Sequence, residues 1–265
     1  MYTKFATSFI LIARQRKFYA GGAPNEAPAT VALTISDRLV NLKSEADLSR
    51  PLKLLQLADS ALPIGGLAHS FGLESMVEEG LLTVDDLFPY FEGLLEEGLL
   101  LEAVFCRTAH GHAKSGEPIR ALNGCLNAWR LARESREASL SLGKRFLRLV
   151  ASLDPSPLVQ AAAAIGEIHF SIAFGFALGA LSFDADETVA AYLHQSVASL
   201  LSAAQRLLSL GQMQSSRISW ELKPMIAAAV VRSAHFDSAS VPAFSHLPEL
   251  ASMRHPCLPT RLFIS

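Results

Sequence analysis

The chain has few cysteines, few charges and few aromatic residues. Its 265 residues contain three cysteines, Cys106, Cys125 and Cys257. This small, odd and widely spaced set argues against a disulfide framework and favours a reducing compartment, the cytoplasm. Charged residues make up 18% of the chain, aromatic residues 8%, and the net charge is −2. Because no long basic run occurs beyond the N-terminus, we expect no nucleic-acid partner.

The sequence also lacks the motifs of common catalytic sites. The run Gly65-Gly66-Leu67-Ala68-His69-Ser70 has the residue types of a nucleophile elbow at the wrong spacing. The run Gly143-Lys144-Arg145 lacks both the leading glycine and the Ser/Thr of a phosphate-binding loop. We therefore expect a protein without catalytic residues that does not hydrolyse nucleotides by itself.

Two short motifs are weak candidates for metal binding. His110 and His112 lie two positions apart, so on a helix they would point to nearly opposite faces, whereas in an extended loop they could chelate a metal. His255 and Cys257 could offer an imidazole and a thiolate. Two ligands form at best a transient site, so we expect no tightly bound metal or cofactor. The alternative is a helical metal-dependent hydrolase that uses His110 and His112.

Hydrophobic residues make up half of the chain, enough for a sizeable core. We expect a disordered extension over residues 1–50 and one all-α, bundle-like domain over 51–265. The basic N-terminus could alternatively be a transit peptide or follow from a start codon placed too far upstream. No alternating strand pattern of useful length is present.

The apolar periodicity predicts helices over most of the second region. A capping signal at 83–86 precedes a helix through 91–103, and residues 119–150 are helical with a possible break near 135–141. A helix over 185–210 begins after Asp184 and is closed by Gly211. A further helix over 216–233 is kinked or broken at Pro224, and the proline-rich last thirty residues are expected to be mostly irregular.

The apolar run 158–183 is long enough to span a bilayer. It contains Glu167 and His169, which would be costly in a membrane, so we expect a buried helix and no membrane partner. Gly175 and Gly179 would let a neighbouring helix pack closely. The alternative, a membrane-embedded helical protein, predicts solubility only in detergent.

Residues 54–80 carry the most informative pattern, LLQLADSALPIGGLAHSFGLESMVEEG. An apolar helical run ends at a proline, and Gly65-Gly66 predicts a tight turn. The turn would hold His69, Ser70 and Glu74 near one another at a helix start, with Gly80 as its C-cap. The string resembles the N-terminal signature of the UreF family of urease accessory proteins, although Leu67 stands where an aromatic residue is common.

Three further blocks resemble the same family in the same order. Residues 133–149 match an Arg-Glu-x-Arg-Glu pattern followed by Gly-x-Arg, and residues 206–212 match a basic-Leu-x-x-x-Gly-Gln segment. The last block is the tail 251–265, where Pro256, Cys257, Leu258, Pro259 and Thr260 replace the family's Glu-Thr-x-Tyr-Ser. Two prolines there remove backbone donors and fix φ. This difference bears on the geometry or the partner choice of the tail's docking contact, and it leaves the resemblance to the family unchanged.

The resemblance implies a non-catalytic, dimeric chaperone for urease maturation. Its partners would be a UreD/UreH-like scaffold protein, a UreG-like GTPase and apo-urease, and nickel would pass through the complex. A partner-binding or nickel-path surface would include Gly65, Gly66, His69, Ser70, Glu74, Arg133, Arg136, Arg206 and Gln212. A docking tail at about 245–265 would include Arg254, His255, Arg261 and Phe263.

Overall fold

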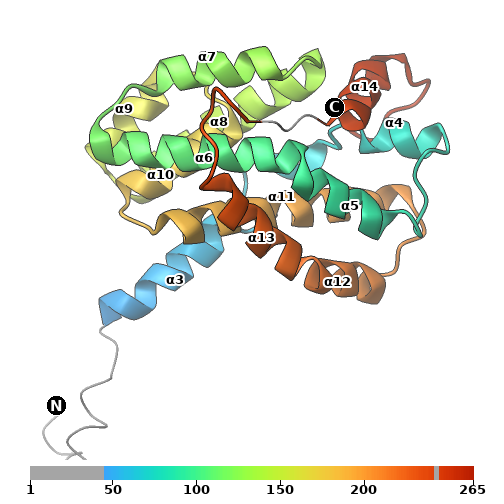
Figure 1. The fold of residues 1–265 in the computed structure, drawn as a ribbon, viewed down its shortest axis with the longest axis horizontal. Helices are drawn as coiled ribbons and strands as arrows, with labels where there is room; N and C mark the ends of the chain where they lie inside the picture. The colour runs from blue at the N-terminus through green and yellow to red at the C-terminus, as the bar shows by residue number, and fades with distance from the viewer. Residues whose placement is uncertain (1–44, 242–244) are drawn as a thin grey trace, which may run out of the picture. The chain divides into compact units, whose positions relative to one another are not determined.

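All regular structure in the described part of the chain is helical, which confirms the all-α prediction (Figure 1). The computed structural model describes residues 45–241 and 245–265, so the predictions for residues 1–44 lie outside it. Residues 49–265 form one unit. The α-helices are α3 (Glu45–Leu57), α4 (Leu73–Glu78), α5 (Leu87–Glu96), α6 (Gly98–Ser115), α7 (Ile119–Trp129), α8 (Arg133–Leu153), α9 (Pro157–Ile165), α10 (Phe170–Ala180), α11 (Ala185–Leu207), α12 (Gln212–Glu221), α13 (Lys223–Ser233) and α14 (His246–Arg254).

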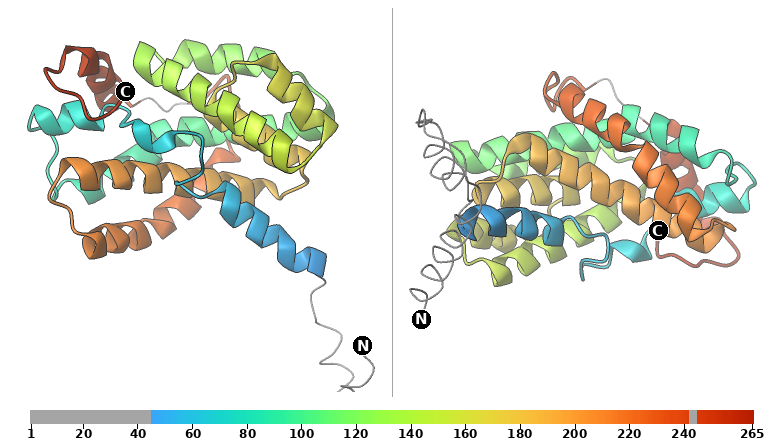
Figure 2. Two further views of the ribbon diagram at one scale, coloured as in Figure 1. Left: turned by 180° about the vertical axis from the view of Figure 1, so that it is seen from behind. Right: turned by 90° about the horizontal axis from the view of Figure 1, so that it is seen from below.

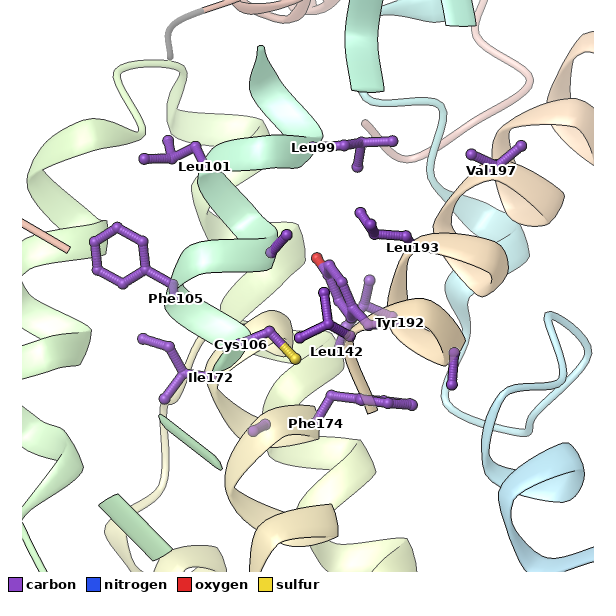
Figure 3. Close-up of a cluster of buried hydrophobic side chains, with 14 of the residues drawn as sticks. Leu99, Leu101, Phe105, Cys106, Leu142, Ile172, Phe174, Tyr192, Leu193 and Val197 are labelled. Atoms are coloured by element: carbon purple, nitrogen blue, oxygen red, sulfur yellow. The ribbon is translucent and has the colours of Figure 1, made fainter. Parts of the chain in front are cut away.

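The core of this unit lies between α6, α8, α10 and α11. Helix α10 packs against α6, α8 and α11, and nine of its residues are buried. Figure 3 shows how side chains from all four helices meet in this core. Three aromatic rings meet there. The centroid of the Phe174 ring lies 5.1 Å from that of Phe146 and 5.8 Å from that of Tyr192. Burial of large apolar side chains is the main source of stability for such a bundle.

The apolar run 158–183 is two helices rather than one. Helix α9 ends at Ile165, Gly166 follows with φ +100°, and α10 begins at Phe170. The prediction of close packing at Gly175 and Gly179 is confirmed. A Cβ added at Gly175 would lie 1.9 Å from the Cys106 carbonyl oxygen, and one at Gly179 would lie 2.6 Å from the His110 carbonyl oxygen. Among the described residues, no helix is both long and apolar enough to cross a membrane.

Two predicted helix boundaries are wrong because tertiary hydrogen bonds place the breaks elsewhere. The helix expected through 91–103 is divided at Glu97, and the Gly98 amide donates to Ser245 Oγ at 2.9 Å. The break expected near 135–141 instead precedes α8, where the Ala132 amide donates to Glu249 Oε2 at 2.8 Å. Both boundaries are therefore fixed by side chains from the far end of the chain.

The end of α11 also differs from the prediction, although its start does not. Asp184 caps the helix by accepting from the amides of Asp186 and Glu187, as expected. The helix ends at Leu207, three residues before the predicted end, and the Leu210 side chain is buried. Gly211 has φ −68° and precedes α12, so it does not close α11. The break at Pro224 is confirmed, because α12 and α13 are separate helices.

The last thirty residues are more ordered than expected. They contain α14 and a short 3₁₀ helix, η2 (His255–Cys257). Pro248 lies in the first turn of α14, where a backbone N–H has no partner within the helix. The prediction of a mostly irregular tail is therefore wrong for residues 246–257, because a proline in the first turn of a helix does not prevent the helix from forming. Figure 2 shows that α14 lies beside α4, with the C-terminus next to both, and the two helices are in contact.

His169, which precedes α10, should make stability fall in acid. It is fully buried and neither ring nitrogen has a hydrogen-bond partner among the described residues. Burial, and then the charges of Arg130 and Arg136, lower the pKa of His169 to about 3. The unfolded chain therefore binds a proton below about pH 6.5 that the folded chain does not, and stability falls as pH decreases through that window.

We expect this one histidine to cost about 2 kcal/mol between pH 7.5 and pH 5, at about 1.4 kcal/mol per pH unit below its unfolded pKa. His169→Phe retains a buried ring that cannot be protonated and should lose correspondingly less stability over the same range. Urea unfolding of both proteins at the two pH values measures the difference. An equal loss in both would contradict the assignment of acid sensitivity to His169.

Candidate functional site

The glycine pair forms the predicted turn, with different roles for its two residues. Gly65 has φ +87°, and a Cβ there would lie 2.5 Å from Arg145 Nη1. Arg145, on α8, donates to the Ile64 carbonyl at 3.2 Å and so links the turn to that helix. Gly66 begins a short 3₁₀ helix, η1 (Gly66–Ala68), and no atom lies within 4 Å of the position of its missing Cβ.

Gly65→Ala should therefore destabilise the protein, whereas Gly66→Ala should not. The left-handed conformation costs a non-glycine residue about 1–2 kcal/mol, and displacing Arg145 removes its bond to the Ile64 carbonyl. At Gly66 a Cβ meets open space, so we expect a change within about 0.5 kcal/mol. Urea unfolding of both variants measures the contrast. Equal effects would show that the turn does not depend on the conformation of Gly65.

The end of the chain lies directly on this turn. The Ser265 carbonyl accepts from the Ser70 amide at 2.5 Å and from Ser70 Oγ at 3.0 Å. His69 Nδ1 lies 2.8 Å from Ser265 Oγ, and the Ile264 amide donates to the Ala68 carbonyl at 2.9 Å. Burial, and then the charge of Arg145, lower the pKa of His69. Two predicted site residues therefore bind the protein's own C-terminal segment.

Glu74 is the central anchor of that segment. Its side chain is 3% exposed and lies in the first turn of α4. Its Oε1 accepts from the Leu262 amide at 2.5 Å, and Oε2 accepts from the Phe263 amide at 3.2 Å. The same Oε2 lies 2.8 Å from His255 Nε2. A buried carboxylate is thus paired with two backbone donors and one imidazole, as burial of a charge requires.

His255 bridges two carboxylates from different helices. Its Nε2 bonds to Glu74 on α4, and its Nδ1 lies 2.7 Å from Glu134 Oε2 on α8. The ring is fully buried. Each ring nitrogen therefore has a carboxylate oxygen within hydrogen-bond distance. His255 therefore ties the tail to α4 and α8 at once and has no nitrogen left for a metal.

Arg206 and Phe263 complete the attachment. Arg206, in the last turn of α11, donates to the Leu67 carbonyl at 2.7 Å. Its guanidinium also lies over the Phe263 ring, 4.2 Å from the centroid, in cation–π geometry. The Phe263 side chain is 4% exposed. One arginine therefore contacts both the turn and the tail.

Glycine at position 72 permits the contact between α4 and α14. Gly72 has φ +89°, and a Cβ there would lie 2.5 Å from the Pro248 carbonyl oxygen and 2.9 Å from the Ser252 amide. Arg254, at the end of α14, pairs with Glu79 at 2.9 Å. The backbone of α14 thus comes so close to Gly72, the glycine of the Gly-Leu-Glu motif, that a side chain would not fit there.

The structure brings together most, but not all, of the predicted site residues. Arg133 is exposed and pairs with Glu137 within α8, and Arg136 donates to the Arg130 carbonyl at 3.0 Å. Gln212 is exposed at the start of α12. The residues that converge are Gly65, His69, Ser70, Glu74, Arg206, Arg254, His255, Arg261 and Phe263, with Gly66 in the same turn.

Sequence reasoning missed two residues of this cluster. Glu134 bonds to His255 and lies 3.8 Å from Arg261 Nη1, and Arg145 supports the turn. Both stand inside the block at 133–149, and Glu134 directly follows the predicted residue Arg133. The pattern itself was therefore the available signal, but it does not show which of two neighbouring charges points inward.

The candidate metal ligands do not form a site. His110 is buried and its Nε2 lies 2.9 Å from the Phe183 carbonyl, whereas His112 Nε2 lies 3.3 Å from Glu117. Cys257 is exposed, and its neighbour His255 is engaged by carboxylates. Across residues 45–241 and 245–265, no three His, Cys, Asp or Glu side chains are grouped so that they could hold a metal ion.

A second polar group lies deeper, at the junction of two cavities. Glu102 and Arg130 form a largely buried ion pair with an N–O distance of 2.7 Å, and Tyr192 donates to the same carboxylate at 3.3 Å. Cavities of about 100 and 90 Å³ share this pair in their walls. The first reaches Ser252 of α14, and the second reaches Gly66 of the turn.

Comparison with known proteins identifies the family. The model of the UreF family matches residues 82–223. The chain belongs to the UreF family. A urease accessory protein UreF of Paenarthrobacter aurescens is 34% identical over 228 residues, covering 81% of this chain and 97% of the relative. UreF proteins of Nostoc sp. PCC 7120 and Bacillus sp. TB-90 are 33% and 30% identical, covering 81% and 82% of this chain and 95% and 100% of the relatives.

Membership in the UreF family confirms the resemblance drawn from the four sequence blocks. It also gives the chain an accessory role in urease maturation rather than a catalytic one. The alternative of a hydrolase that uses His110 and His112 is therefore wrong. The family match agrees with the geometry, in which these two histidines make separate contacts.

Proposed function

We propose that this UreF protein is a non-catalytic chaperone that binds a UreD/UreH-like scaffold and a UreG-like GTPase and assists nickel insertion into apo-urease. One observation carries the proposal. Motifs at 65–74, 134, 206 and 255–265, far apart in the sequence, meet in one cluster that ties the C-terminal segment to the turn. We propose that the chain works in the cytoplasm, in keeping with its three free cysteines, and that it forms a homodimer as the family resemblance implies.

The tail would dock the scaffold through its exposed residues rather than its buried anchors. His255 and Phe263 are buried, whereas Arg254, Arg261, Leu262 and Ile264 are exposed. Helix α14 buries two small side chains, Ala251 and Ser252. Its exposed residues include three apolar ones, namely Leu247, Leu250 and Met253. An apolar outer face of this kind is typical of a protein–protein interface.

The GTPase would contact the surface formed by the turn and by Arg206. Leu67 and Arg206 are exposed and adjacent, since Arg206 binds the Leu67 carbonyl. This surface adjoins the tail through the Phe263 ring. Binding of the scaffold to the tail would therefore act directly on the groups that hold the turn.

Nickel would pass the interior without being held tightly. The two cavities extend from Gly66 beneath the turn to Ser252 beneath α14, with Glu102 at their junction. The lining is mostly apolar, and Gln195 Oε1 is a buried acceptor without a hydrogen-bond partner among the described residues. A sparse set of oxygen ligands would suit transit rather than storage.

Co-purification with the cognate scaffold protein tests the proposal, followed by size-exclusion chromatography with the GTPase and its nucleotide. We expect a stable ternary complex that the double variant Leu262→Asp/Ile264→Asp fails to form. Leu153→Asp is the matched control, because Leu153 is similarly exposed but lies at the far end of α8. Absence of a complex with the unmodified chain would overturn the proposal.

A further inference from the structure

Glu134 contacts two tail residues that lie six positions apart. Its Oε2 bonds to His255 Nδ1 at 2.7 Å, and its Oε1 lies 3.8 Å from Arg261 Nη1. Its own side chain is 21% exposed, so these interactions are partly shielded from water. The loop 256–260 is therefore closed at its base by one carboxylate on α8.

This loop is the part of the tail that departs from the family pattern. Pro256 and Pro259 fix φ at two of its five positions and reduce the freedom that the loop loses on closure. Four of the five residues are exposed, and Leu258 is only partly buried. Because few side chains of the loop are packed against the rest of the protein, the position of the loop is set mainly by its two ends.

The residues beyond the loop lie in an alternating register. Leu262 and Ile264 are 55% and 67% exposed, whereas Phe263 and Ser265 are buried. A shift of one residue along an extended segment exchanges its outward and inward side chains. Such a shift would turn Phe263 outward and remove the apolar surface that Leu262 and Ile264 present. Glu74 accepts directly from the Leu262 and Phe263 amides, and the anchor at the loop base acts together with Glu74 in setting which side chains face outward.

We propose that Glu134 is a positioning residue. By holding His255 and Arg261 together, it acts with Glu74 to fix the register of residues 262–265 and to keep Leu262 and Ile264 on the surface. The consequence for scaffold binding rests on the function proposed above, whereas the positioning of the segment does not.

Amide hydrogen exchange of the free, full-length protein tests the positioning, with Glu134→Ala compared with Glu137→Ala. Glu137 lies one turn further along α8 and pairs with the exposed Arg133 of the same helix, so it is a matched control. We expect Glu134→Ala to accelerate exchange of the Leu262, Phe263 and Ile264 amides about tenfold or more, with the amides of α8 and α10 unchanged. Glu137→Ala should behave as the unmodified protein.

Two further variants separate positioning from general support of the fold. Glu134→Gln retains an acceptor for His255 without the charge and should restore part of the protection. Glu134→Ala combined with His255→Ala should accelerate exchange no more than His255→Ala alone, because either change breaks the bridge from His255 through Glu134 to Arg261.

Some results would overturn the proposal. Unchanged exchange at 262–264 in Glu134→Ala, or acceleration spread equally over α8 and α10, would show that Glu134 does not act on the tail specifically. Scaffold affinity in the same variant should fall about tenfold or more, and an unchanged affinity would overturn the link to the docking surface. If the unmodified chain bound no scaffold while exchange changed as expected, the proposed function would fail and the positioning would stand.

Discussion

Replacing Glu74 by alanine is expected to reduce nickel-dependent urease activation at least about tenfold. The change leaves two backbone amides and the buried His255 without their acceptor. Breaking a buried pair by removing one partner costs about 3–5 kcal/mol, and 1.4 kcal/mol already shifts an equilibrium tenfold. The tail can relieve this cost by leaving the turn, so we expect local detachment of residues 255–265 rather than global unfolding.

Urease activity in cells that carry the other accessory genes measures the effect of Glu74→Ala. Glu78→Ala is the matched control, since Glu78 lies on the same short helix but is exposed. A melting temperature close to that of the unmodified protein would show that the fold survives. Unchanged activation in Glu74→Ala would mean that the cluster around Glu74 is not part of the functional surface.

Features fixed by local interactions were predictable from the sequence. The turn at Gly65, the cap at Asp184 and the break at Pro224 each follow from the conformational preferences of a few neighbouring residues. The prediction that His69, Ser70 and Glu74 lie together is confirmed for the same reason. All three are found within six positions of one another, around one turn and the start of α4.

Features fixed by the far end of the chain were not predictable. The boundaries before α6 and α8 depend on Ser245 and Glu249, which lie more than a hundred residues away in the sequence. The inward direction of Glu134 depends on His255 in the same way. Family patterns indicated which segments matter, but the pairing of their side chains required the folded arrangement. Whether Gln212, Arg133 and Arg136 bind partners stays a prediction.

Gly175→Ala should strongly destabilise the core. A Cβ at this position would lie 1.9 Å from the Cys106 carbonyl oxygen and 3.0 Å from its Cα, so backbone rather than a flexible side chain has to move. Helix α6 cannot retreat from α10 without disturbing the whole core (Figure 3). We expect a loss of about 3 kcal/mol or more and a melting temperature about 6–12 °C lower.

Gly111→Ala gives the opposite expectation on α6, the helix that faces Gly175. Gly111 is exposed, and no atom lies within 4 Å of the position of its missing Cβ. Alanine in a helix interior is favoured over glycine by about 0.5–1 kcal/mol, so this variant should be slightly more stable. Thermal unfolding of both variants measures the contrast. If Gly175→Ala melted with the unmodified protein, α6 and α10 could not be in the close backbone contact that defines this core.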